Sequence, residues 1–120
     1  NYIFTPLCDT ATITINIIPV NIVNDPPVAN DDRANTPKNV SAKVNVLAND
    51  FDPNGDPLTV TVINQPKNGT ATVNADKTVK YTPNSNYVGA DTFRYRICDN
   101  GSPSLCDTAY VYIDIVDDSL

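Results

Sequence analysis

Carboxylate and amide side chains crowd into one stretch in the middle of the chain, residues 49–57, which reads NDFDPNGDP and contains no Lys or Arg. Carboxylates this close together repel one another unless a positive charge lies between them. Oxygen atoms of carboxylates and amides are the ligands that Ca²⁺ prefers, in a flexible shell of about six to eight. The stretch therefore predicts a calcium site formed by Asp50, Asp52, Asn54 and Asp56.

The alternating spacing of these residues is similar to the first half of a helix–loop–helix calcium loop, with Gly55 at the sixth position. The twelfth position of such a loop supplies a bidentate Glu, but here it is Thr61. A helix–loop–helix calcium site is therefore excluded, whereas calcium binding by this stretch is not. A plain polar turn, in which Asp and Asn side chains accept hydrogen bonds from backbone amides, remains the alternative.

The composition of the 120 residues indicates one all-β domain with a short segment left over. All 14 acidic residues are Asp, and the abundant Thr, Val and Ile favour strands. The formal net charge of −6 argues against nucleic acid and anionic membranes as partners. No stretch is long and apolar enough for membrane insertion. Because the chain has no His, and no nucleophile lies near a base, we expect no enzyme activity.

Polar and apolar residues alternate in short segments that turn residues separate, which predicts strands and no helix. One such strand, residues 10–18, precedes a Pro-containing linker at residues 24–27. After the linker we expect seven strands, at residues 28–32, 39–48, 58–64, 70–74, 78–82, 91–98 and 107–116. Seven short strands with turns about every 8–12 residues predict an immunoglobulin-like Greek-key β-sandwich.

A short repeat links the two ends of the chain. The segment LCDTA occurs at residues 7–11 and again 98 positions later, at residues 105–109. The apolar positions after it also correspond: Ile13 to Val111, Ile15 to Ile113 and Ile17 to Ile115. A repeat of this length has the size of one sandwich domain, so the parent protein is expected to be a tandem array.

This repeat divides the chain into three parts. Residues 1–23 are expected to be the last strand and linker of a preceding copy, residues 24–116 one complete sandwich, and residues 117–120 the start of the next linker. A second hypothesis is a fibre subunit that polymerises by donating the strand at residues 10–18 to its neighbour. Both hypotheses make neighbouring copies the partners of this chain.

The chain has an odd number of cysteines: Cys8, Cys98 and Cys106. Cys98 and Cys106 flank a tight turn between two predicted antiparallel strands, so we predict a disulfide between them. By the repeat offset, the partner of Cys8 falls just before Asn1, outside this stretch. Reduced, buried cysteines are the alternative. A disulfide implies an oxidising compartment.

Several motifs resemble, in the same order, those of bacterial cadherin-like and immunoglobulin-like tandem repeats. They are NDPPVANDD at residues 24–32, VLANDFDPNGDPLTV at 46–60, PKNGTA at 66–71, YTPN at 81–84 and GADTFRY at 89–95. The resemblance covers essentially all of residues 24–116. It implies a cadherin-like sandwich in a large adhesin or filament, located extracellularly at the bacterial cell surface.

In cadherin-type arrays Ca²⁺ lies at the junction between domains. The resemblance therefore implies that Asn24 and Asp25 are linker ligands beside the acidic stretch, with Asp91 and Asp99 as further candidates. The glutamates usual in cadherins have no counterpart, since this chain has no Glu. We expect a mechanical role, in which calcium at the junction stiffens an adhesin stalk or surface filament.

A carbohydrate-binding module is a third hypothesis, from a different functional class. Arg94 and Arg96 alternate on one face of a predicted strand, and Tyr110 and Tyr112 do so on the next strand along the chain. Such a face binds a glycan or a protein, or it is a solvated surface in which guanidinium groups cover aromatic rings. Tyr87 stands where sandwiches place a structural corner tyrosine.

Overall fold

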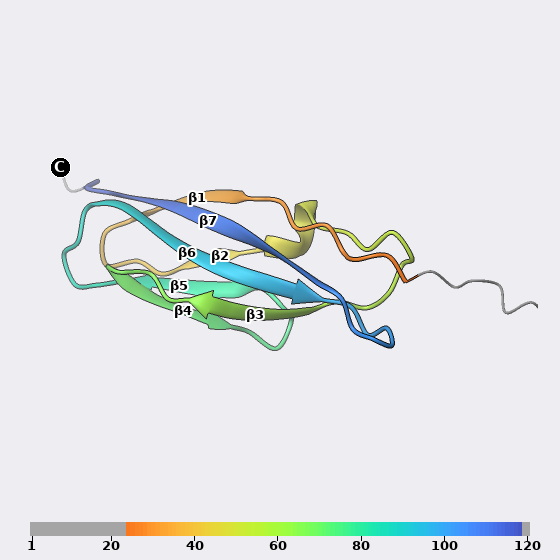
Figure 1. Cartoon of the computed structure of the whole chain (residues 1–120). Coiled ribbons are helices and arrows are strands. Elements are labelled where there is room, and N and C mark those ends of the chain that lie inside the picture. The colour runs from red at the N-terminus through yellow and green to blue at the C-terminus, as the bar shows by residue number, and fades with distance from the viewer. Residues whose placement is uncertain (1–23, 119–120) are drawn as a thin grey trace, which may run out of the picture.

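In the computed structural model, which describes residues 24–118, seven strands form two sheets packed face to face (Figure 1). The strands are β1 (Asp32–Pro37), β2 (Ala42–Val44), β3 (Thr59–Asn64), β4 (Gly69–Val73), β5 (Val79–Pro83), β6 (Gly89–Cys98) and β7 (Cys106–Val116). A single 3-10 turn, η1 (Val46–Asn49), follows β2. The predicted immunoglobulin-like β-sandwich is confirmed.

One sheet has the strand order β1-β7-β6-β3, and the other has the order β2-β5-β4. β1 runs parallel to β7, whereas the other neighbouring strands are antiparallel. The chain changes sheets between β1 and β2, after η1, between β3 and β4, and between β5 and β6. These crossings produce the predicted Greek-key arrangement, in which β6 and β7 are the long central pair.

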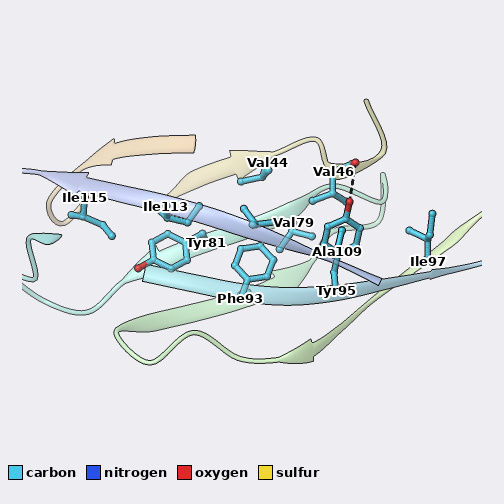
Figure 2. Packing of buried hydrophobic residues seen from close by; sticks show 12 residues of the cluster. Val44, Val46, Val79, Tyr81, Phe93, Tyr95, Ile97, Ala109, Ile113 and Ile115 are labelled. Atoms are coloured by element: carbon cyan, nitrogen blue, oxygen red, sulfur yellow. Dashed lines mark hydrogen bonds between the residues drawn. The ribbon is translucent and has the colours of Figure 1, made fainter. Parts of the chain in front are cut away.

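The core lies between the two sheets and is supplied mainly by alternate residues of β6 and β7 (Figure 2). Phe93, Tyr95 and Ile97 point inward from β6, and their neighbours point outward, as the period of two requires. The Phe93 ring stacks on that of Tyr81 from the opposite sheet, with centroids 6.5 Å apart. Each such buried side chain contributes about 1.5–3 kcal/mol. This core fixes where β6 and β7 end, and therefore where their connecting hairpin lies.

The strand predicted at residues 28–32 is wrong, because β1 begins only at the last of these residues. The backbone amide of Ala29 donates to the carboxylate of Asp107 at 2.9 Å. The amide of Asn30 donates to the carboxylate of Asp50 at 2.7 Å. Carboxylates from distant parts of the sequence thus accept the hydrogen bonds from these backbone amides, which the carbonyl groups of a neighbouring strand would otherwise accept.

The strand predicted at residues 39–48 is also wrong in length, since β2 covers only three of these residues and η1 replaces its end. The expectation of no helix fails at this one turn, where the amide of Ala48 donates to the carbonyl of Asn45 at 3.1 Å. The turn buries Val46 completely while it redirects the chain toward the acidic loop. Within residues 24–118, no helix has the length and apolar character to cross a membrane.

The first described residues and the end of β7 lie at opposite ends of the sandwich (Figure 1). Three segments gather where the chain enters, and together we call them the linker end: residues 24–25, 50–57 and 99–105. The last of these is the hairpin loop between β6 and β7. The predicted strand at residues 10–18 lies outside the described residues.

Candidate metal centre

Three carboxylates converge at the linker end. Asp52 and Asp56 come from the acidic loop between η1 and β3, and Asp99 comes from the β6–β7 hairpin. One carboxylate oxygen of each residue lies within 4.8 Å of one from each of the others. Asp52 and Asp56 are half-buried, whereas Asp99 is only 4% exposed. The site therefore combines two loops that are far apart in sequence.

The acidic loop is curled around the carboxylate of Asp52. Its Oδ2 accepts hydrogen bonds from the backbone amides of Asn54 (3.0 Å) and Asp56 (2.9 Å). Gly55 permits this curvature because its φ of 74° lies in the left-handed region. The other oxygen of Asp52, Oδ1, is buried and has no hydrogen-bond partner. One half of the carboxylate thus shapes the loop, and the other half is free to bind a ligand.

Asp99 shows the same division between its two oxygens. Oδ1 accepts hydrogen bonds from the backbone amides of Gly101 (3.0 Å) and Leu105 (2.9 Å). The amide of Leu105 is the largest influence on the pKa of Asp99 and lowers it, and the amide of Gly101 and the side chain of Asn24 act in the same direction, although burial opposes the shift. Oδ2 is buried without a hydrogen-bond partner. An ionised carboxylate thus keeps one oxygen unsatisfied in a buried position, which is costly unless a cation binds there.

No positive side chain compensates these three charges in the part of the chain that the structure describes. Its ion pairs, Lys43–Asp76 and Lys38–Asp117, lie elsewhere. Burial, followed by the charges of Asp52 and Asp99, raises the pKa of Asp56. The arrangement is therefore electrostatically unfavourable by itself, and a divalent cation would relieve the repulsion.

The structure does not bring Asp50 into this group. The hydroxyl of Tyr95 donates to its Oδ2 at 2.6 Å, and the amide of Asn30 donates to its Oδ1. Burial raises the pKa of Asp50, while these two hydrogen bonds act in the opposite direction. Both oxygens of Asp50 thus have partners within the protein, whereas Asp52 and Asp99 each have one oxygen without a hydrogen-bond partner.

The remaining predicted ligands lie beside the site and attach the linker to it. The side-chain amide of Asn24 donates to the carbonyl of Pro103 in the β6–β7 hairpin at 3.1 Å. The backbone amide of Asp25 donates to Oδ1 of Asn54 in the acidic loop at 2.7 Å. The two linker residues therefore contact the two loops that supply the three carboxylates.

The other two candidates that the resemblance implied have different positions. Asp91 lies near the start of β6, toward the opposite end of the sandwich, and accepts a hydrogen bond from the hydroxyl of buried Tyr81 at 2.6 Å. Asp99 belongs to the site, yet spacing alone does not predict it, because 43 positions separate it from Asp56. Its sequence signal is an Asp directly after the Cys that ends a strand, followed by Asn100-Gly101.

The predicted disulfide between Cys98 and Cys106 is present. It joins the last residue pair of β6 and β7, with Cα atoms 4.1 Å apart, immediately before Asp99. Cys8 lies outside the described residues. Tyr87 donates its hydroxyl proton to the carbonyl of Ala90 at 2.6 Å, three residues downstream, whereas a corner tyrosine bonds to backbone upstream of itself.

Comparison with solved structures agrees with this fold. One similar structure is a nucleoside hydrolase-related protein from Saccharophagus degradans associated with carbohydrate metabolism (TM-score 0.50, 19% identity, 78% of this chain and 26% of that one). Two endo-fucoidan hydrolases of glycoside hydrolase family 107 are also similar. MfFcnA4 has a TM-score of 0.55 and 19% identity over 82% of this chain and 15% of its own. MfFcnA9 has a TM-score of 0.53 and 20% identity over 74% of this chain and 15% of its own.

These identities establish likeness of fold alone, and the chain spans about a quarter or less of each of these proteins. Comparison with curated proteins gave no match. The family model described as "Bacterial Ig domain" matches residues 24–114, which is most of the chain and nearly all of the sandwich. The chain therefore belongs to the bacterial immunoglobulin-like domain family.

Proposed function

We propose that this chain is a structural repeat of an extracellular adhesin stalk or surface filament on a bacterial cell, and that calcium at the linker end stiffens its junction with the preceding copy. One observation carries the proposal. Asp52 and Asp99, which each have a buried oxygen without a hydrogen-bond partner, form a carboxylate cluster with Asp56. This cluster lies beside the two residues through which the chain enters the sandwich.

The donors of this site suit calcium in their chemistry. All three are carboxylate oxygens, which are hard ligands, and no His or thiol lies among them. They come from two loops whose hydrogen bonds fix one oxygen of Asp52 and one of Asp99. Calcium accepts an irregular oxygen shell and completes it with water or carbonyl groups, whereas magnesium demands a near-ideal octahedron. We therefore assign calcium as the preferred cation.

The hydrogen bonds of the linker explain how such a cation would act mechanically. Asn24 is attached to the hairpin and Asp25 to the acidic loop. Mutual repulsion among the three carboxylates favours separation of these two loops, and a bound cation favours their approach. Because each loop holds one linker residue, the cation also restrains the direction in which the chain leaves toward the preceding copy.

Thermal unfolding of residues 1–120 in about 2 mM CaCl₂ and then in excess EDTA tests this proposal. At a calcium concentration of about 100 times the Kd, binding stabilises the fold by about 2.7 kcal/mol, which raises the Tm by roughly 10 °C. Asp99→Asn should abolish this difference. Asp114→Asn, which removes an equal charge from an exposed position on β7, should preserve it. An unchanged Tm on chelation would leave the acidic loop as a turn only.

The fibre-subunit hypothesis receives less support from the fold. The described sandwich contains its own last strand, β7, between β1 and β6. The segment at residues 10–18, which resembles β7 in sequence, would therefore have to add to an edge strand of a complete sandwich. A covalent tandem array needs no vacant position of this kind, and we prefer it for that reason.

A glycan-binding role is the second candidate, and a row of side chains on the outer face of the larger sheet favours it. The guanidinium of Arg33 lies 4.9 Å from the ring centre of Tyr112, and that of Arg94 lies 5.4 Å from the ring centre of Tyr110. The two Tyr rings are 6.1 Å apart. Affinity electrophoresis with fucoidan as a sulfated probe and dextran as a neutral one tests this role. Retardation that Tyr110→Ala abolishes would support it.

A further inference from the structure

The hairpin that supplies one of the three carboxylates is closed by a covalent bond. Cys98 and Cys106 face each other in the last register pair of β6 and β7 and form a disulfide. Asp99 is the next residue after this bond. Cys106 is exposed and Cys98 half-buried, so thiol reagents in solution can reach the bond. A redox-active link thus lies one residue from a candidate cation ligand.

Beyond the disulfide, the hydrogen bonds of the hairpin loop centre on Asp99. Its backbone amide donates to the carbonyl of Leu105 at 2.9 Å, and its carbonyl accepts from the hydroxyl of Ser104 at 2.6 Å. Its Oδ1 accepts the amides of Gly101 and Leu105. The conformation of the loop and the direction of Asp99 Oδ2 are therefore set by the same interactions.

This loop is hydrogen-bonded to the linker and lies close to the acidic loop. Asn24 reaches the carbonyl of Pro103 from the linker. One carboxylate oxygen of Asp99 lies within 4.8 Å of one from each of Asp52 and Asp56 in the acidic loop, and Oδ2 of Asp99 is buried without a hydrogen-bond partner. A cation between Asp99 and Asp52 would thus add a strong connection between the hairpin and the acidic loop. Such a connection depends on a hairpin that is already ordered.

We propose that closure of the Cys98–Cys106 disulfide and binding of the cation are cooperative. Closing the disulfide raises the affinity of the site for calcium, and bound calcium favours the closed disulfide. This inference rests on the cation site of the proposed function. The disulfide restricts the hairpin, so less conformational entropy is lost when Asp99 is fixed in its binding position. Couplings of this kind amount to about 5–150-fold in affinity.

The redox step involves two electrons. The disulfide and two glutathione thiols exchange to give the Cys98 and Cys106 thiols and one molecule of oxidised glutathione. Because linkage is reciprocal, the factor by which oxidation raises calcium affinity equals the factor by which calcium shifts this exchange toward the disulfide. The junction would therefore be held less firmly in a reducing compartment and most firmly where oxidant and calcium are both present.

Calorimetric titration of the full chain with CaCl₂ gives the first half of the test. A Cys8→Ser background removes the third thiol, and the oxidised protein is compared with the same chain carrying Cys98→Ser and Cys106→Ser. We expect the pair of substitutions to weaken calcium binding about tenfold. Equal affinities would overturn the inference and leave the proposed function intact. Absence of calcium binding in the oxidised chain would overturn both.

Redox equilibration gives the second half of the test and leaves Cys98 and Cys106 unchanged. The Cys8→Ser chain is incubated in glutathione buffers of graded ratio, with saturating calcium or with EDTA, and its free thiols are counted. At the point where half of the protein is reduced, the ratio [GSH]²/[GSSG] should be about tenfold higher with calcium than with EDTA. Asp99→Asn should remove this shift, and Asp114→Asn should keep it. Equal midpoints with and without calcium would overturn the coupling even if the Ser variants failed to fold.

Discussion

Two groups of aspartates lie close together in this sandwich and differ in what satisfies them. Around Tyr95, Asp50 accepts hydrogen bonds from a hydroxyl and from a backbone amide. At the linker end, only two residues further along the chain, Asp52 has one oxygen bonded within its loop and one buried without a partner. Proximity in sequence therefore says little about the role of a carboxylate. Its partners in the folded state decide whether it stabilises the core or is available to a cation.

The largest effect should come from Tyr95→Phe, which removes the hydroxyl at the centre of the first group. The Tyr95 hydroxyl lies 2.6 Å from Asp50 Oδ2, 3.0 Å from the carbonyl of Asn30 and 3.4 Å from that of Val46, the last contact being drawn in Figure 2. Without it the half-buried carboxylate of Asp50 loses one of its two donors, which should cost about 3 kcal/mol in urea unfolding. A loss below about 0.5 kcal/mol would mean that this group is as open to solvent or cations as the second.

The next effect is a pH dependence to which Asp32 should contribute most. Asp32 interacts with Asp50 and Tyr95 of the first group, and its Oδ2 is buried without a hydrogen-bond partner. Burial, assisted by the charge of Asp50, raises the pKa of Asp32 from 3.8 to about 6, although a hydrogen bond with Tyr95 opposes the shift. The native state then binds more protons than the unfolded state between about pH 4 and 6, so stability should fall as pH rises through this window and level off above it.

The fall should be on the order of 2 kcal/mol in urea titrations with EDTA present, which excludes any contribution from a cation. Asp32→Asn should make the curve shallower between these pH values, because asparagine does not titrate, and Asp50 and Asp56, whose pKa values burial also raises, should account for the slope that remains. The depressed pKa of Asp99 acts in the opposite direction and below the usual Asp range, so it leaves this window unchanged. An equal slope in Asp32→Asn would show that another group is responsible.

A pair of matched substitutions compares the two groups directly in their response to calcium. Asp52→Asn keeps an oxygen for the amides of Asn54 and Asp56 but places an amide at the unpartnered position, so calcium affinity should fall at least about tenfold. Asp50→Asn removes the same charge from a carboxylate that already has partners, and calorimetry should find its affinity within about twofold of the parent chain. Equal losses in both variants would contradict the distinction.

The regular part of this fold was predictable because local pattern and tertiary environment agree there. Phe93, Tyr95 and Ile97 alternate with polar residues, so the period of two identifies both the strand and its buried face. The disulfide was predictable too, since Cys98 and Cys106 flank a short turn between such strands. In these elements every informative residue lies within a few positions of its neighbours.

The irregular parts depend on partners far away in sequence. The arm before β1 is fixed by carboxylates of Asp107 and Asp50, which no local pattern announces. The composition of the acidic stretch predicted a cluster, and Asp52 and Asp56 do cluster. The spacing of residues does not predict that Asp50 accepts a hydrogen bond from Tyr95, or that Asp99 of the hairpin joins the cluster, because both contacts depend on how the sheets pack.

The central claim is that one cation bridges the acidic loop and the β6–β7 hairpin. The most direct test is a calcium titration of the ¹⁵N-labelled chain, followed by the amide resonances of the two loops. The account predicts that Asn54 and Asp56, which donate to Asp52, shift together with Gly101 and Leu105, which donate to Asp99, along one binding curve. Shifts confined to one loop, or none at all, would contradict it.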